Sequence, residues 1–65
     1  MQLNSDKLRS KLFKLGITQK ELAQQIGVSK NTINAICRGR SCKDETGTAI
    51  ADALGVTLDS ILLKR

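Results

Sequence analysis

Two short helical segments joined by a three-residue turn constrain this chain more than any other feature. In the stretch TQKELAQQIGVSKNTINAICRG, from Thr18 to Gly39, apolar residues recur at helical spacing on both sides of Gly27-Val28-Ser29. A connection this short makes the two helices cross steeply, and Gly27 tolerates the positive backbone φ that such a turn requires. The sequence therefore predicts a tightly packed helix pair.

Local signals fix the starts of both helices in this pair. Thr18 and Glu21 have the spacing of a capping box, in which each side chain accepts a hydrogen bond from the backbone N–H of the other residue. Ser29 carries a suitable N-cap side chain for the second helix. We expect Ala23 to be the small residue where the helices meet, with Ile33 as its partner. This packing leaves the opposite face of the second helix to be presented outward.

Leucines at helical spacing indicate another helix before the pair. It covers about residues 6–15, with Ser5 or Asn4 as its N-cap, and Gly16 ends it. The side chains that we expect on its core face are Leu8, Leu12 and Leu15. The core positions expected elsewhere in the chain are Leu22, Ile26, Ile33, Ile36, Ile50 and Leu54.

Two more helices follow a polar loop after the pair. The fourth helix covers about residues 45–54 with Asp44 as its N-cap, although Gly47 weakens its first turn. The fifth covers residues 58–63 with Thr57 as its N-cap. No segment alternates between apolar and polar residues for long enough to form a strand. The sequence therefore predicts an all-α fold of five short helices in one domain, residues 1–65.

The composition excludes several function classes. The chain lacks histidine, and no clustered metal ligands or catalytic Ser/His/Asp set occurs, so we expect no enzyme, no metal site and no cofactor. Without an apolar run of membrane-spanning length or a leader pattern, we expect a soluble cytoplasmic protein in which Cys37 and Cys42 are reduced thiols. Phe13 is the only aromatic residue, which argues against RNA or single-stranded DNA held by base stacking.

Positive charge is concentrated in the first two thirds of the chain. The net charge is +5, and nine Lys or Arg residues lie between Lys7 and Lys43 against one acid, Glu21. From Asp44 to Arg65 there are two basic and four acidic residues. This distribution fits a protein with one basic face directed at a polyanion, and the charge alone fits a solvated basic surface equally well.

The stretch TQKELAQQIGVSKNTINAICRGR resembles the helix-turn-helix of the Cro/repressor-type, lambda-repressor-like family of phage and bacterial regulators. The later stretch IADALGVTLDSIL is similar to the fourth and fifth helices of that family. The resemblance covers about residues 8–63, and the positions that carry it are Gln19, Glu21, Leu22, Ala23, Gly27, Val28, Ile33, Ile36 and Gly39. It implies a sequence-specific double-stranded DNA-binding transcriptional regulator whose third helix enters the major groove.

The resemblance also implies roles for individual side chains. The expected base-contacting residues are Lys30, Asn31, Thr32, Asn34 and Ala35. The expected phosphate-contacting residues are Gln19, Arg38, Arg40 and Lys43. The chemistry is suitable, because Lys30 can donate to guanine, Asn31 can pair with adenine through two hydrogen bonds, and Ala35 can contact a thymine methyl group.

This chain departs from the family pattern at two places in its first helix. Several family members pair a basic residue there with an acid near the end of the third helix, whereas this chain has Leu12 and Cys37, so we expect an apolar contact. Lys11 stands where the family often has an apolar residue. Phe13 either takes over that packing or lies partly exposed.

The family analogy further implies a homodimer on a near-palindromic operator. The candidate dimer residues lie at the C-terminal end: Val56, Thr57, Leu58, Ile61, Leu62 and Leu63. The favoured hypothesis is a repressor that acts as a phage or mobile-element switch. Two alternatives stay open: an autoregulatory antitoxin or restriction-system controller with the same fold, and a protein-interaction module that has lost DNA binding.

Overall fold

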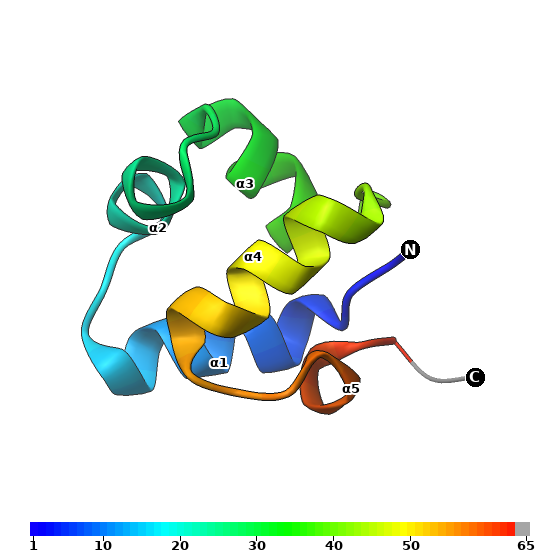
Figure 1. Ribbon diagram of the computed structural model, residues 1–65. Coiled ribbons are helices and arrows are strands. Elements are labelled where there is room, and N and C mark those ends of the chain that lie inside the picture. The colour runs from blue at the N-terminus through cyan, green and yellow to red at the C-terminus, as the bar shows by residue number, and fades with distance from the viewer. Residues whose placement is uncertain (64–65) are drawn as a thin grey trace.

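Five helices make up the part of the chain that the computed structural model describes, residues 1–63 (Figure 1). They are α1 (Ser5–Leu15), α2 (Gln19–Ile26), α3 (Lys30–Cys37), α4 (Asp44–Leu54) and α5 (Leu58–Ile61). Extended pairing within these residues is limited to one isolated antiparallel bridge, between Leu3 and Leu62. The expected all-α fold is confirmed. None of the helices in this range has both the length and the apolar character needed to cross a membrane.

The predicted capping signals operate at the first three helices. Asn4 is the N-cap of α1, and its Oδ1 accepts a hydrogen bond from the Lys7 N–H at 3.1 Å. The capping box is complete, since Thr18 Oγ1 and the Glu21 carboxylate each accept the other residue's backbone N–H at 3.1 Å. Ser29 caps α3. Because these bonds join residues that are close together in the sequence, the starts of these helices could be predicted from the sequence.

The fourth helix starts one residue earlier than the sequence suggested. Lys43 occupies the N-cap position and makes no side-chain cap bond, so the prediction that Asp44 caps this helix was wrong. Asp44 instead lies in the first turn with Glu45, where a carboxylate is favoured by the positive end of the helix dipole.

The fifth helix is shorter than predicted and ends at Ile61. Leu62 leaves helical geometry, with φ −73° and ψ 137°, and pairs with Leu3 instead. Thr57 holds the N-cap position, but its side chain makes no cap bond. A helix of four residues therefore depends on packing rather than on capping.

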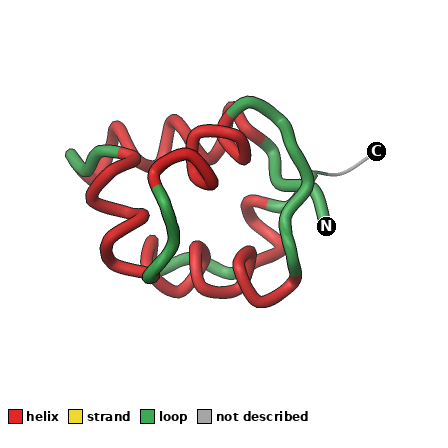
Figure 2. The backbone as a smooth tube through the Cα atoms, turned by 90° about the horizontal axis from the view of Figure 1, so that it is seen from above, coloured by secondary structure: helices red, strands yellow, loops and turns green. Residues whose placement is uncertain are grey.

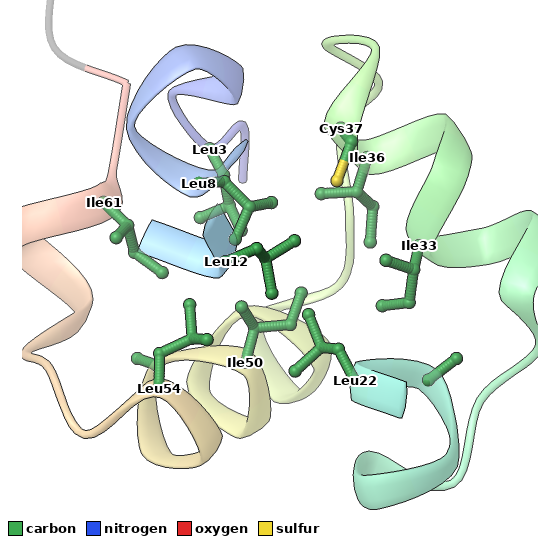
Figure 3. Packing of buried hydrophobic residues seen from close by; sticks show 12 residues of the cluster. Leu3, Leu8, Leu12, Leu22, Ile33, Ile36, Cys37, Ile50, Leu54 and Ile61 are labelled. Atoms are coloured by element: carbon green, nitrogen blue, oxygen red, sulfur yellow. The ribbon is translucent and has the colours of Figure 1, made fainter. Parts of the chain in front are cut away.

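All five helices contribute to one apolar cluster, together with Leu3 from the segment before α1 (Figure 3). Its buried members are Leu3, Leu8, Leu12, Leu22, Ala23, Ile33, Ile36, Cys37, Ile50, Ala51, Leu54 and Ile61. Ile26 packs against this cluster but is only partly buried. Leu12 and Cys37, which were expected to make an apolar contact, both lie within the cluster.

Two side chains of α1 fall outside the core. Leu15 was expected in the core but is 46% exposed, because it lies in the last turn of α1 and Ile17, after the Gly16 turn, packs against the cluster instead. Phe13 is 88% exposed, so it does not take over the packing that Lys11 cannot provide.

The α4 helix lies in the middle of the arrangement and contacts α1, α2 and α5 (Figure 1). The α3 helix packs on α1 and α2, on the other side of α4 from α5 in this view. Seen from above, the segment before α1 and the loop between α3 and α4 run close together at one end of the molecule (Figure 2). This arrangement leaves one face of α3 uncovered by any other helix.

Candidate nucleic-acid interface

The turn between α2 and α3 has the geometry that the sequence predicted. Gly27 adopts φ 78°, in the left-handed region that favours glycine, and its N–H donates to the Ala23 carbonyl at 2.9 Å. The Val28 N–H donates to the same carbonyl at 3.0 Å, and the Val28 side chain packs against the core. These two bonds hold the turn against the end of α2, and the turn therefore fixes the direction in which α3 starts.

The two sides of α3 differ sharply in exposure. Ile33 and Ile36 are 0% and 2% exposed and pack in the cluster that also contains Leu22 and Ala23 of α2. The outer side carries Lys30, Asn31, Thr32, Asn34 and Arg38, which are exposed, and Ala35, which is partly buried. We refer to these six residues as the α3 outer face. Its side chains are cationic or neutral and polar apart from one methyl group.

Two adjoining hollows bring most of the expected DNA-contacting residues together. Asn31, Asn34, Ala35, Arg38 and Arg40 line the first hollow. The second lies between α3 and the start of α4, and its lining includes Thr32, Ala35, Arg40 and Lys43. Ala35 and Arg40 belong to both, so the α3 outer face and the following loop form one continuous surface. Lys30, the first residue of α3, is exposed outside both hollows.

Gln19 joins this surface through a contact that the sequence did not predict. Asn34 Nδ2 donates a hydrogen bond to Gln19 Oε1 at 3.3 Å, which ties the start of α2 to the middle of α3. Because the Gln19 oxygen is engaged, its amide N–H groups are the part of the side chain left to donate to a ligand. Gln19 therefore suits a phosphate oxygen better than it suits a cation.

The hydrogen-bonding groups of Thr32 are partly used within the first turn of its own helix. Its backbone N–H donates to Ser29 Oγ at 3.2 Å, and the two hydroxyl oxygens lie 2.9 Å apart. This local pairing fixes the N-cap and orients the Thr32 hydroxyl toward Ser29. Of the residues expected to contact bases, Thr32 is thus held most strongly by its own turn.

The basic residues do not all lie on this surface, which corrects the expectation of a single basic face. Lys7, Lys11 and Lys14 line a separate hollow between α1 and α5, with Val56 and Ile61 on its other side. Neither of the two ion pairs found within residues 1–63 involves the cations near α3, since one joins Arg9 to Asp6 and the other joins the Met1 nitrogen to Asp44. The positive charges of Lys30, Arg38, Arg40 and Lys43 therefore remain available to an anionic ligand.

Cys37 is buried and Cys42 is partly buried. Burial raises the pKa of Cys37, an effect that nearby Arg9 partly opposes, and burial also raises the pKa of Cys42. Both are free, and a raised pKa favours the protonated, less nucleophilic form. Cys37 is 1% exposed and serves as a core residue. No group of three or more potential metal-binding side chains occurs in residues 1–63.

The candidate dimer surface is only partly accessible. Ile61, one of the expected dimer residues, is 3% exposed and belongs to the core, so it offers almost no surface to a second copy. Val56, Leu58 and Leu62 are partly buried. Thr57 and Leu63 are the exposed members, and Leu63 is 38% exposed. The buried isoleucine closes the core beneath these side chains.

The structural role of the segment before α1 was not predicted from the sequence. Leu3 is 1% exposed, and the residues around it bond to both the α3–α4 loop and the residues after α5. The alternation of apolar and polar residues in MQLN was the available signal, but four residues are too few to distinguish a strand from a free terminus.

A helix pair joined by a three-residue turn, with a buried inner side and a polar, cationic outer face on its second helix, is typical of the helix-turn-helix class. A family model described as "Helix-turn-helix" matches residues 8–61, and the chain belongs to this family. The lambda-repressor-like fold suggested by the sequence is in agreement with this assignment.

Curated relatives show where similar domains occur. The HTH-type transcriptional regulators for conjugative element R391 of Providencia rettgeri and for conjugative element SXT of Vibrio cholerae are each 39% identical over 56 residues, which make up 86% of this chain and 26% of the relative. The Repressor protein C of Rhizobium phage 16-3 is 38% identical over 52 residues, 80% of this chain and 20% of the relative. The chain thus spans only 20–26% of the length of these relatives.

Proposed function

We propose that this chain binds double-stranded DNA in a sequence-specific manner and regulates transcription, most simply as a repressor. The observation that carries this proposal is the α3 outer face, which is exposed and cationic on a helix whose other side is fully buried. Membership of the helix-turn-helix family and the names of the relatives, which are transcriptional regulators and a repressor, support it. Occupancy of a promoter would then block or recruit polymerase without any catalytic step.

In the proposed complex α3 lies in the major groove and presents its N-terminal half to the bases. Lys30 donates to guanine O6 and N7, and Asn31 makes paired hydrogen bonds with adenine. Ala35 contacts a thymine methyl group, for which its partly buried position offers a small apolar site. Thr32 and Asn34 contribute less, because each already has a hydrogen-bond partner in the protein.

Phosphate contacts hold the domain on the duplex and carry no sequence information directly. We assign them to Gln19 at the start of α2 and to the cations at the end of α3 and in the following loop, namely Arg38, Arg40 and Lys43. Gln19 donates its amide N–H groups, and the cations contribute attraction that weakens with salt.

A second copy of the chain is the proposed partner on a near-palindromic operator, with half-sites about 34 Å apart. The exposed residues available for this contact are Thr57 and Leu63, with Val56, Leu58 and Leu62 partly accessible beside them. We further propose a switch in a phage or mobile element of a bacterium, acting in the cytoplasm or nucleoid. The names of the relatives, which concern conjugative elements and a phage, favour this setting.

Selection from random double-stranded DNA, followed by titration of the winning sequences against salt, tests the proposal. We expect an enriched inverted repeat and a steep fall in affinity as salt rises. One enriched half-site would support DNA recognition but contradict the dimer. No enrichment, together with weak and salt-insensitive binding, would refute the proposed function and leave a protein-interaction module as the explanation of the fold.

A further inference from the structure

The loop between α3 and α4, residues 39–43, is tied to the first residues of the chain. The Cys42 N–H donates to the Met1 carbonyl at 2.7 Å, and the Met1 main-chain nitrogen donates to the Cys42 carbonyl at 2.8 Å. Gln2 Nε2 donates to the Gly39 carbonyl at 2.6 Å. These three bonds span both ends of the loop, which carries Arg40 and Lys43.

The segment that holds the loop, residues 1–4, is itself well anchored; we call it the N-terminal strap. Leu3 lies in the core and forms the antiparallel bridge with Leu62. The Asn4 N–H donates to the Ile61 carbonyl at 2.7 Å, and the Leu63 N–H donates to the Gln2 carbonyl at 3.0 Å. One edge of the strap therefore pairs with the last residue of α5 and the residues after it, and the other edge pairs with the loop.

Gly47 shows that α4 accommodates the strap. A glycine in the first half of a helix costs helix propensity, and Gly47 has no positive φ that would require one. A Cβ atom at this position would overlap Met1 Sδ, and Leu58 Cδ1 lies 3.5 Å from the same point. The absence of a side chain at Gly47 thus lets the Met1 side chain lie directly on α4, beside the paired loop.

We propose that the N-terminal strap is a positioning element for DNA binding, which holds the α3–α4 loop so that Arg40 and Lys43 meet phosphates while α3 occupies the groove. This inference rests on the proposed function. Neither cation has an ion-pair partner within residues 1–63, so the course of the loop backbone is what places their charges. Gln2 acts through the Gly39 carbonyl and is a positioning residue that need not touch DNA.

Two substitutions loosen the strap in different ways. Gly47→Ala displaces the flexible Met1 side chain from α4, and we expect the fold to be kept because alanine improves the helix propensity at that position. Gln2→Ala removes the bond to Gly39 from an exposed side chain. Gln25→Ala is the matched control, because Gln25 is exposed and lines a different hollow beside Asp52 and Ala53 of α4.

The first measurement follows the loop without DNA. Cys42 is partly buried in the loop and Cys37 is buried in the core, so the rate at which a maleimide labels Cys42 reports how often the loop opens. We expect Gly47→Ala and Gln2→Ala to raise this rate several-fold, and Gln25→Ala to leave it at the value of the unsubstituted chain. Unchanged labelling in both strap variants would overturn the inference.

The second measurement is affinity for a random duplex at 50 and 200 mM salt. Loss of one phosphate contact lowers the slope of log K against log salt by about 0.9, so the affinity ratio between the unsubstituted chain and a strap variant should shrink about 3.5-fold across this range. Faster labelling with an unchanged salt slope would overturn the positioning role while leaving the proposed function intact. Failure of the unsubstituted chain to bind any duplex would overturn both.

Discussion

We expect Asn31→Ala to remove the preference for one base pair in the selected DNA site. Asn31 is exposed on the α3 outer face, and within residues 1–63 its side chain has no hydrogen-bond partner. Its amide can therefore both donate to and accept from an adenine edge without breaking a bond in the protein. Alanine at this position offers no polar group and leaves the helix backbone unchanged.

The size of the effect follows from the two hydrogen bonds that are lost. A well-placed paired contact between asparagine and adenine contributes about 1–3 kcal/mol of discrimination against other bases. At about 1.4 kcal/mol for each factor of ten, this corresponds to roughly a 5-fold to 150-fold loss of preference at one position. Binding to random DNA should change little, because phosphate contacts supply most of it.

Asn34→Ala is the internal comparison, since Asn34 lies on the same helix face but already donates to Gln19 at 3.3 Å. An exposed neutral hydrogen bond contributes about 0.5–1.5 kcal/mol, and a bond of this length belongs at the lower end. Its loss frees Gln19, which we assign to a phosphate. Asn34→Ala should therefore weaken specific and random duplexes alike, by about twofold to threefold.

The assay is a repeat of the random-DNA selection with each variant, followed by titration of single-base variants of the winning site. Relaxed preference at one position for Asn31→Ala, with the full motif kept by Asn34→Ala, would support the assignment. The opposite result, an unchanged motif for Asn31→Ala and a lost position for Asn34→Ala, would refute the argument that free side chains read the bases.

Three further predictions concern phosphate contact and stability. Arg40→Ala should weaken all duplexes similarly and flatten the salt slope by about one unit in a salt titration; a loss confined to the selected site would make Arg40 a base reader instead. Ile33→Ala should lower the free energy of unfolding by about 2–5 kcal/mol in urea denaturation, because Ile33 is 0% exposed. Thr18→Ala should cost about 1 kcal/mol in the same assay by opening the capping box, and an unchanged midpoint would contradict that role.

The features predicted most accurately from the sequence are those determined by residues close together in the chain. The Thr18–Glu21 box, the Ser29 cap and the Gly27 turn each involve residues within a few positions of one another, and all three are present. The α3 outer face also followed from helical spacing alone. Its assignment to DNA contacts stays a prediction.

The errors arise where distant parts of the chain meet. Pairing between Leu3 and Leu62 ends α5 early, and no local pattern near Leu62 indicates that the helix ends there. In the sequence, Gly47 looked like a weak point of α4. The structural reason for a glycine at this position is the contact with Met1, which lies far away in the sequence. The basic residues of α1 and α3 likewise belong to one charge run in the sequence but to separate surfaces in the fold.

The orientation of α3 cannot come from the helix itself. It has eight residues, and isolated helices of that length are marginal in water, so its direction depends on the Ser29 cap and on the burial of Ile33 and Ile36. The side chains that stabilise the domain therefore also orient the α3 outer face. We therefore expect Ile33→Ala to lower both the free energy of unfolding and the affinity for DNA. Asn31→Ala should lower only the affinity for the selected site, because it changes one exposed side chain of the α3 outer face.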